Sequence, residues 1–106
     1  MILTVFRSRL KSDLKPEQLQ KFMQMFGRMS ALAPTMPGYI SHKGFGSEDG
    51  ERVVIVEFET EEAQLAFASH PAHQEAIELG VQHAFLDYSV QICNVQRVAT
   101  PQRAQL

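Results

Sequence analysis

Residues 37–60, PGYISHKGFGSEDGERVVIVEFET, contain the clearest local signal in this chain. Two runs rich in β-branched and aromatic residues, Tyr39–Phe45 and Arg52–Phe58, flank a polar segment that ends in Asp49 and Gly50. An Asp-Gly pair between two such runs is typical of a β-hairpin with a two-residue type I′ turn. We therefore predict that this stretch forms a hairpin.

A two-residue turn would fix which residues of the two strands face one another. It sets Phe45 opposite Val54 and His42 opposite Glu57. A turn one residue longer would flip one strand relative to the other. Because side chains alternate between the faces of a strand, the two-residue turn places one set of residues on each face, and both sets include apolar side chains. The first set is Tyr39, Ser41, Lys43, Phe45, Val54, Val56 and Phe58, and the second is Ile40, His42, Gly44, Val53, Ile55, Glu57 and Glu59.

The segment before the hairpin predicts a strand followed by a helix. Residues 1–10 alternate, with Ile2, Thr4, Phe6 and Ser8 on one face. Pro16 suits the first position of a helix, which should end before Pro34. Apolar residues recur within it at spacings of three and four, which predicts an inward stripe of Leu19, Phe22, Met23, Phe26 and Met29.

The segment after the hairpin predicts a helix in two pieces and a last strand. Thr60 is a suitable N-cap for the first piece, which should stop near His70 because Pro71 disfavours helical geometry in the residue before it. The second piece should run from Pro71 to about Phe85, weakened at Gly80. We expect its inward face to carry His73, Ile77, Val81 and Ala84, and a strand to follow over 87–95 with Tyr88, Val90, Ile92 and Asn94 on one face.

The resulting order, βαββαβ, predicts an α+β ferredoxin-like fold with a four-stranded antiparallel sheet. Residues 1–97 would form the domain, and residues 98–106 a C-terminal tail without periodicity. Helices cover only one face of such a sheet, yet both faces carry apolar residues. We therefore expect the uncovered face to pack against a second copy, which predicts a homodimer.

Composition excludes several classes of partner. The chain of 106 residues has a formal net charge of -2 and no run of like charges, which disfavours nucleic acid and anionic membrane surfaces. No apolar run approaches the roughly 20 residues that would span a bilayer. The single cysteine, Cys93, cannot form an intramolecular disulfide, and the N-terminus lacks the pattern of a signal peptide. We expect a cytoplasmic protein.

Several short motifs resemble the antibiotic biosynthesis monooxygenase (ABM) domain family over roughly residues 1–96. They are Met36-Pro-Gly-Tyr39 before the hairpin, Glu57-Phe-Glu-Thr-Glu-Glu-Ala63 after it, and Ala66-Phe-Ala-Ser-His-Pro-Ala-His73 at the bend between helix pieces. The resemblance implies a dimeric α+β barrel with a pocket between helices and sheet in each subunit. Some members of the family oxidise hydroquinone-like aromatic substrates without a cofactor, others cleave haem, and many have no assigned activity.

Oxygenation without a cofactor needs a dry apolar cavity and a base whose pKa lies near the working pH, because a deprotonated phenol can itself reduce O₂. Histidine is the natural base. We propose His42 and His73 as catalytic residues, and Phe6, Phe67, His70 and Tyr88 as substrate-binding residues. Each has a structural alternative: an exposed pair of His42 with Glu57, a helix cap for His70, a hydrogen-bonded core position for His73, and core packing for Phe6 and Tyr88. Phe67 occupies a position where many relatives carry Trp, and we expect His83 to face solvent.

Other chemistries find less support in the residues. The haem-degrading branch uses a histidine about ten residues beyond the position of Phe67, where this chain has Ile77, and its strand-one Asn corresponds to Phe6 or Ser8. His70 and His73 lack a third convergent ligand for a metal. We therefore predict a monooxygenase without a cofactor, acting on a quinol-like or polycyclic aromatic substrate. The alternative is a non-catalytic domain that binds a small apolar ligand or mediates dimerisation.

Overall fold

The chain folds in the βαββαβ order that its sequence predicts. The computed structural model describes residues 1–100, so the predicted tail over 98–106 lies mostly outside the described residues. A 3₁₀ turn, η1, follows the first helix, and a π-helical turn, η2, precedes the last strand. The elements are β1 (Ile2–Leu10), α1 (Pro16–Leu32), η1 (Ala33–Thr35), β2 (Tyr39–Gly46), β3 (Arg52–Phe58), α2 (Glu61–Ala68), α3 (Pro71–Leu79), η2 (Gly80–Ala84) and β4 (Phe85–Asn94).

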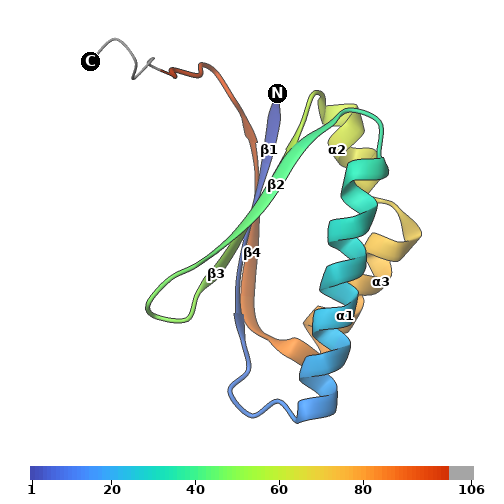
Figure 1. The fold of residues 1–106 in the computed structure, drawn as a ribbon, viewed down its shortest axis with the longest axis vertical. Helices are drawn as coiled ribbons and strands as arrows, with labels where there is room; N and C mark the ends of the chain where they lie inside the picture. The colour runs from blue at the N-terminus through green and yellow to red at the C-terminus, as the bar shows by residue number, and fades with distance from the viewer. Residues whose placement is uncertain (101–106) are drawn as a thin grey trace.

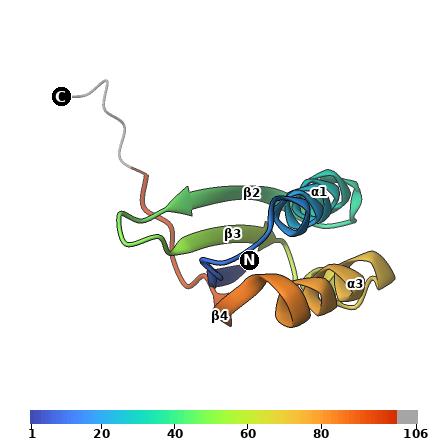
Figure 2. The same cartoon turned by 90° about the horizontal axis from the view of Figure 1, so that it is seen from below.

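The four strands form one antiparallel sheet in the order β2-β3-β1-β4. Within residues 1–100, all the helices lie on one side of the sheet, and no helix or strand covers the other side (Figure 1). Seen from below, the molecule consists of a layer of strands and a layer of helices (Figure 2). This arrangement is the predicted ferredoxin-like α+β fold.

The hairpin forms where it was predicted, but its register differs by one residue. Its turn occupies three residues, 48–50, closed by a hydrogen bond from Gly50 N–H to the Ser47 carbonyl and by one from Ser47 N–H to the Glu51 carbonyl, at 3.0 and 2.8 Å. Gly50 adopts a φ of 90°, which completes the three-residue turn. Phe45 therefore lies opposite Val53, and the predicted Phe45–Val54 pairing is wrong.

The shifted register changes the surroundings of His42. It lies opposite Val56 and faces the helices, whereas Glu57 lies opposite Ser41 on the open face. The Ser41 hydroxyl donates a long hydrogen bond of 3.4 Å to Glu57. The predicted His42–Glu57 pair is therefore wrong, because the two side chains leave the sheet on opposite sides.

Helix α1 covers the sheet with a stripe slightly rotated from the predicted one. Phe22 is buried, and Met25 and Met29 line the helix–sheet interface. Leu19 and Met23 are 41% and 45% exposed, so their predicted inward position is wrong. Met23 follows Phe22 by one residue, which turns it about 100° around the helix axis.

Helices α2 and α3, the two pieces after the hairpin, each begin directly after the residue that the sequence offered as a cap. Thr60 Oγ1 accepts a hydrogen bond from Ala63 N–H, and Nδ1 of His70 accepts one from Ala72 N–H, each at 3.1 Å. The helix changes to a π-helical turn at Gly80, where a Cβ atom would collide with the ring of Phe85. This turn rotates Val81 outward, so its predicted inward position is wrong.

Two aromatic clusters form the core at opposite ends of the helix–sheet interface. In the first, the rings of Phe22 and Phe85 meet edge to face at 5.4 Å. In the second, Phe58 is fully buried and its ring centroid lies 5.5 Å from that of Phe67. The space between the clusters is where a site can form.

Candidate functional site

A cavity of about 170 Å³ lies between the sheet and the three helices, in contact with both aromatic clusters. Its volume is below the 300–1,000 Å³ usual for sites that bind drug-sized ligands, so it suits a small ligand. Its walls are mostly apolar, with a few polar side chains among them. The aromatic walls are Phe6, Phe22, Phe26, Phe67 and Phe85, and the polar side chains are Thr4, Ser8, Ser30, His42, Arg52, Gln64 and His73.

His73 lines this cavity from α3 and has an unsatisfied ring nitrogen. Its Nδ1 atom is buried and has no hydrogen-bond partner among the described residues. The ring meets Phe67 edge to face, with 4.7 Å between the ring centroids. Burial lowers the pKa of His73, the charge of His70 lowers it further, and the carbonyl of Ala68 opposes the shift. His73 is therefore neutral at physiological pH and can accept a proton.

His42 enters the cavity from β2 and is held by a tyrosine. The hydroxyl of Tyr39 lies 2.6 Å from Nδ1 of His42, and the Tyr39 ring rests edge to face on buried Phe58. Nε2 makes no hydrogen bond within the described chain and does not belong to its buried unsatisfied atoms, so it reaches accessible space. The sequence did not indicate Tyr39, because residues three apart in a regular strand face opposite sides. An irregularity in the pairing between Tyr39 and Ser41 brings Tyr39 and His42 together.

The structure brings together four of the six predicted site residues. His42, His73, Phe6 and Phe67 line the cavity, whereas His70 and Tyr88 do not. His70 caps α3, as its structural alternative proposed. Tyr88 is 46% exposed and stacks on the outer side of Phe6, with ring centroids 6.2 Å apart.

The sequence analysis missed Arg52, Ser8 and Gln64. Ser8 and Gln64 are buried polar residues, and both line the cavity. Arg52 begins the run RVVIVEF, and a cation at the start of an apolar strand was a signal that could have pointed to it. His83 is exposed on η2, as predicted.

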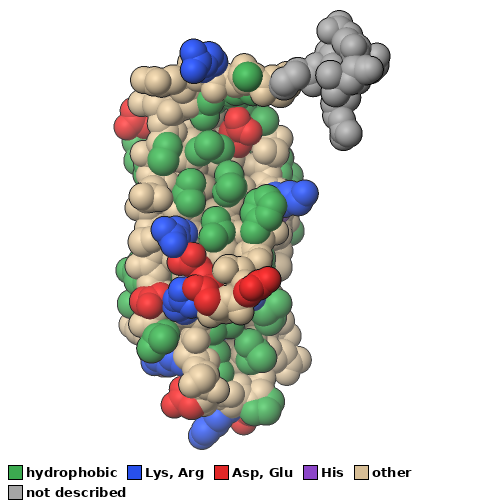
Figure 3. All heavy atoms as spheres, turned by 90° about the vertical axis from the view of Figure 1, so that its left-hand side faces the viewer, with side chains coloured by type: hydrophobic (Ala, Val, Ile, Leu, Met, Phe, Trp, Pro, Cys, Tyr) green, Lys and Arg blue, Asp and Glu red, His purple; other side chains and the backbone are tan. Residues whose placement is uncertain are grey.

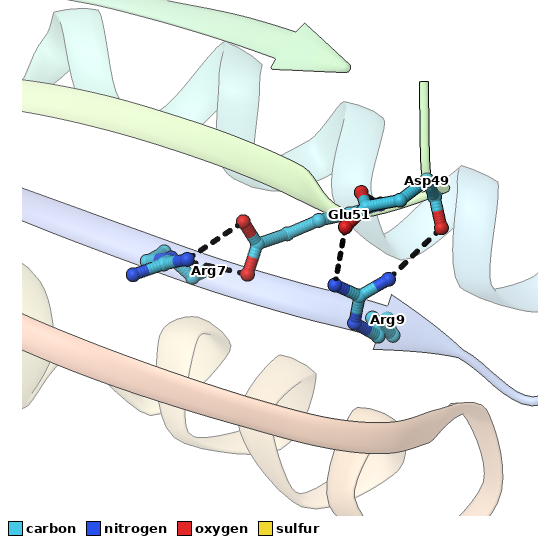
Figure 4. Close-up of polar contacts among 4 residues, drawn as sticks. All are labelled: Arg7, Arg9, Asp49 and Glu51. Carbon is cyan, nitrogen blue, oxygen red and sulfur yellow. Dashed lines mark hydrogen bonds and ion pairs between the residues drawn. The ribbon is translucent and has the colours of Figure 1, made fainter. Parts of the chain in front are cut away.

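The open face of the sheet differs in character from the cavity. Apolar side chains gather in its upper half, and acidic and basic side chains form a cluster below them (Figure 3). In this cluster Arg7 binds Glu51 through two hydrogen bonds of 2.8 and 3.1 Å, and Arg9 binds the carboxylate of Asp49 at 2.8 Å (Figure 4). The hydrogen bond from Arg9 is the main cause that lowers the pKa of Asp49 to about 2.

Residues 1–100 contain neither a metal-binding cluster nor a membrane-spanning helix. No three His, Cys, Asp or Glu side chains come together there as a metal site would require. None of the helices in this range has the length and apolar character needed to cross a bilayer.

A family model and a solved structure that are similar to this chain carry the same description. A family model described as antibiotic biosynthesis monooxygenase matches residues 5–79. No curated protein matches the chain. A Deinococcus radiodurans structure, solved as a candidate antibiotic biosynthesis monooxygenase, has a TM-score of 0.78 at 10% identity and covers 96% of this chain and 99% of its own.

Two further solved structures share the fold. SnoaB, a cofactor-independent oxygenase from Streptomyces nogalater, has a TM-score of 0.71 at 15% identity over 92% of this chain and 94% of its own. A dimeric protein of ferredoxin-like fold from Bacteroides fragilis has a TM-score of 0.67 at 14% identity over 89% and 95%. At these identities the likeness extends to the fold.

Proposed function

Because this chain belongs to the antibiotic biosynthesis monooxygenase family, we propose that it is a cofactor-independent monooxygenase that acts on a quinol-like or polycyclic aromatic substrate. The observation that carries this proposal is the apolar cavity with a neutral, unpaired histidine nitrogen in its wall. The description of SnoaB as a cofactor-independent oxygenase supports the reaction class.

His73 is the base in this proposal. Its Nδ1 has no partner within residues 1–100, so a substrate hydroxyl that reaches it would donate to it without displacing an existing hydrogen bond. Its lowered pKa keeps the ring neutral before the proton arrives. Aromatic walls exclude water, which removes the hydration shell of the phenolate and prevents side reactions of the intermediates.

His42 holds the substrate oxygen in this proposal, and Tyr39 fixes its tautomer. In this arrangement the Tyr39 hydroxyl donates its one proton in a hydrogen bond to Nδ1 of His42 across the 2.6 Å contact. Nδ1 then acts as the acceptor, so the single ring proton of neutral His42 lies on Nε2, which donates to the substrate oxygen. One histidine therefore accepts a proton while the other stabilises the anion that forms.

The proposed reaction balances without an external reductant. A hydroquinone and O₂ give a hydroxyquinone and water: one oxygen atom bonds to a ring carbon and the other leaves as water. The substrate supplies all four electrons. Deprotonation at His73 starts the reaction, because the phenolate reduces O₂ far more readily than the phenol.

We also propose that two copies pair through their open faces. Alternation places Leu3, Val5, Val53 and Ile55 on that face, away from the cavity. Burial of such a patch against its own copy removes apolar surface from water. Size-exclusion chromatography with light scattering should show a dimer at micromolar concentration, and a monomer would contradict this proposal.

We place the protein in the cytoplasm, because its single cysteine has no partner for an intramolecular disulfide.

An oxygen electrode tests the enzymatic proposal. With 1,4-naphthohydroquinone, the protein should consume O₂ faster than buffer, and His73→Asn should lower the rate by about 10²-fold or more. His83→Asn is the matched control, since His83 is exposed on η2. If O₂ uptake equals that of buffer while calorimetry still detects ligand binding, the chain is a non-catalytic binding domain.

A further inference from the structure

Arg52 forms part of the wall between the cavity and an outer groove. The groove, of about 370 Å³, runs beside β2 and is bordered by Gly44 and Gly46. Cavity and groove share three lining residues, Phe26, Arg52 and Val54. A ligand that extends from the cavity toward solvent on this side would pass Arg52.

The charge of Arg52 has no acidic partner within the described residues. Arg7 and Arg9 both pair with carboxylates, at 2.8 Å each, whereas Arg52 lies in no ion pair there. Its guanidinium instead rests over the ring of Phe26, 5.3 Å from the centroid, and one of its nitrogens lies 3.9 Å from the sulfur of Met23. These weak contacts involve the face of the guanidinium and one of its nitrogens, and they leave its other hydrogen-bond donors available.

Ser8 adds a second polar group beside Arg52. Ser8 lies directly opposite Arg52 in the pairing of β1 with β3, and both line the cavity. Ser8 is 5% exposed, yet its hydroxyl does not belong to the buried unsatisfied atoms of residues 1–100. A guanidinium and a hydroxyl that line the same cavity are suited to a carboxylate, which accepts hydrogen bonds from both.

The geometry points to Arg52 as the residue that selects a substrate bearing a carboxylate, with the acid at Arg52 and Ser8 and the reacting ring toward the histidines. His42 lies opposite Val56, four residues along β3 from Arg52. This spacing corresponds to about 13 Å along the strand, enough for a bicyclic ring system between the two ends. The inference deepens the proposed function and rests on it for the orientation of the ring.

Calorimetry with two air-stable probes tests this inference without measuring O₂ uptake. At neutral pH, 2-naphthoic acid carries a carboxylate, whereas methyl 2-naphthoate has the same rings and no charge. The wild-type protein should bind the acid about tenfold more tightly than the ester or better, as expected for hydrogen bonds to a charged group. Arg52→Gln should abolish this preference and leave the affinity for the ester unchanged.

Two further variants identify the cause of any change. Lys21→Gln removes one positive charge from the exposed side of α1 and should keep the preference for the acid. Arg52→Lys keeps the charge without the planar fork and should give an intermediate preference. Equal affinity for both probes in the wild-type protein, absence of binding by either, or a preference that survives in Arg52→Gln would overturn the inference. A protein that prefers the acid but consumes no O₂ would retain this site and lose the proposed oxygenase activity.

Discussion

Polar residues on the two sides of the sheet differ in whether they have acidic partners. On the open face, Arg7 and Arg9 pair with acidic residues of the hairpin and remain in water. On the helix-covered face, His73 and Arg52 have no acidic partner among the described residues. A polar group that is satisfied contributes to structure, whereas one that is left unsatisfied in an apolar wall is available to a ligand. The covered face is therefore where we place the chemistry.

The largest expected difference between the faces is in packing. Phe58 on the covered face is fully buried, whereas Phe45 on the open face is 50% exposed. Phe58→Ala should lower the free energy of unfolding by about 3–5 kcal/mol, because it leaves a cavity in the second aromatic cluster. Phe45→Ala is the matched control and should cost far less in urea denaturation at low protein concentration. Equal losses would mean that both faces are buried under those conditions.

A smaller effect on stability is expected at Gly80, where η2 packs closely against the ring of Phe85. A Cβ atom at Gly80 would collide with the Phe85 ring, so Gly80→Ala should destabilise the protein by about 1–3 kcal/mol. Gly27 lies within α1, and a Cβ atom added there would have open space around it. Gly27→Ala should therefore stabilise the protein by up to about 1 kcal/mol, as alanine favours a helix. Thermal unfolding of both variants checks the opposite signs, and stabilisation by Gly80→Ala would contradict the packing described above.

The burial of His73 predicts a dependence of stability on pH. Because burial lowers the pKa of His73 in the folded protein, the unfolded chain binds a proton more readily. The free energy of unfolding should therefore be constant above the ordinary histidine pKa of 6.5 and fall as the pH drops below it. Urea unfolding at pH 7.5 and 5.5 should show a smaller loss in His73→Asn than in the wild-type protein. An identical loss in both would show that other groups cause it.

The smallest effect should come from the ion pairs of the open face, because solvent screens exposed charges. Asp49→Asn removes the partner of Arg9 and should lower the urea midpoint slightly at low salt and less at high salt. The pKa of Asp49 is lowered from 3.8 to about 2, so its contribution is present above pH 3.8 and disappears as the pH falls toward 2. An equal decrease of the urea midpoint at low and high salt would show that Asp49 acts through the turn that it helps to form, and not through its ion pair.

Local signals predicted the elements well, because each depends on neighbouring residues. Thr60 and His70 accept hydrogen bonds from backbone amides of residues that follow them, and Pro71 restricts the residue before it. The two helix starts could therefore be read directly from the chain. Alternation likewise predicted that Phe6 and Ser8 share one face of their strand, and both line the cavity. The predicted cavity wall was partly correct for the same reason.

The chain alone therefore established the order of elements, the antiparallel sheet and the presence of histidines near an apolar interface. The folded molecule decided the hairpin register, the contact of Tyr39 with His42 and the position of Arg52 at the cavity wall. Each of these depends on a backbone irregularity or on residues distant in sequence. One extra residue in a turn reverses a whole strand face, and no local pattern specifies whether that residue belongs to the turn or to the strand.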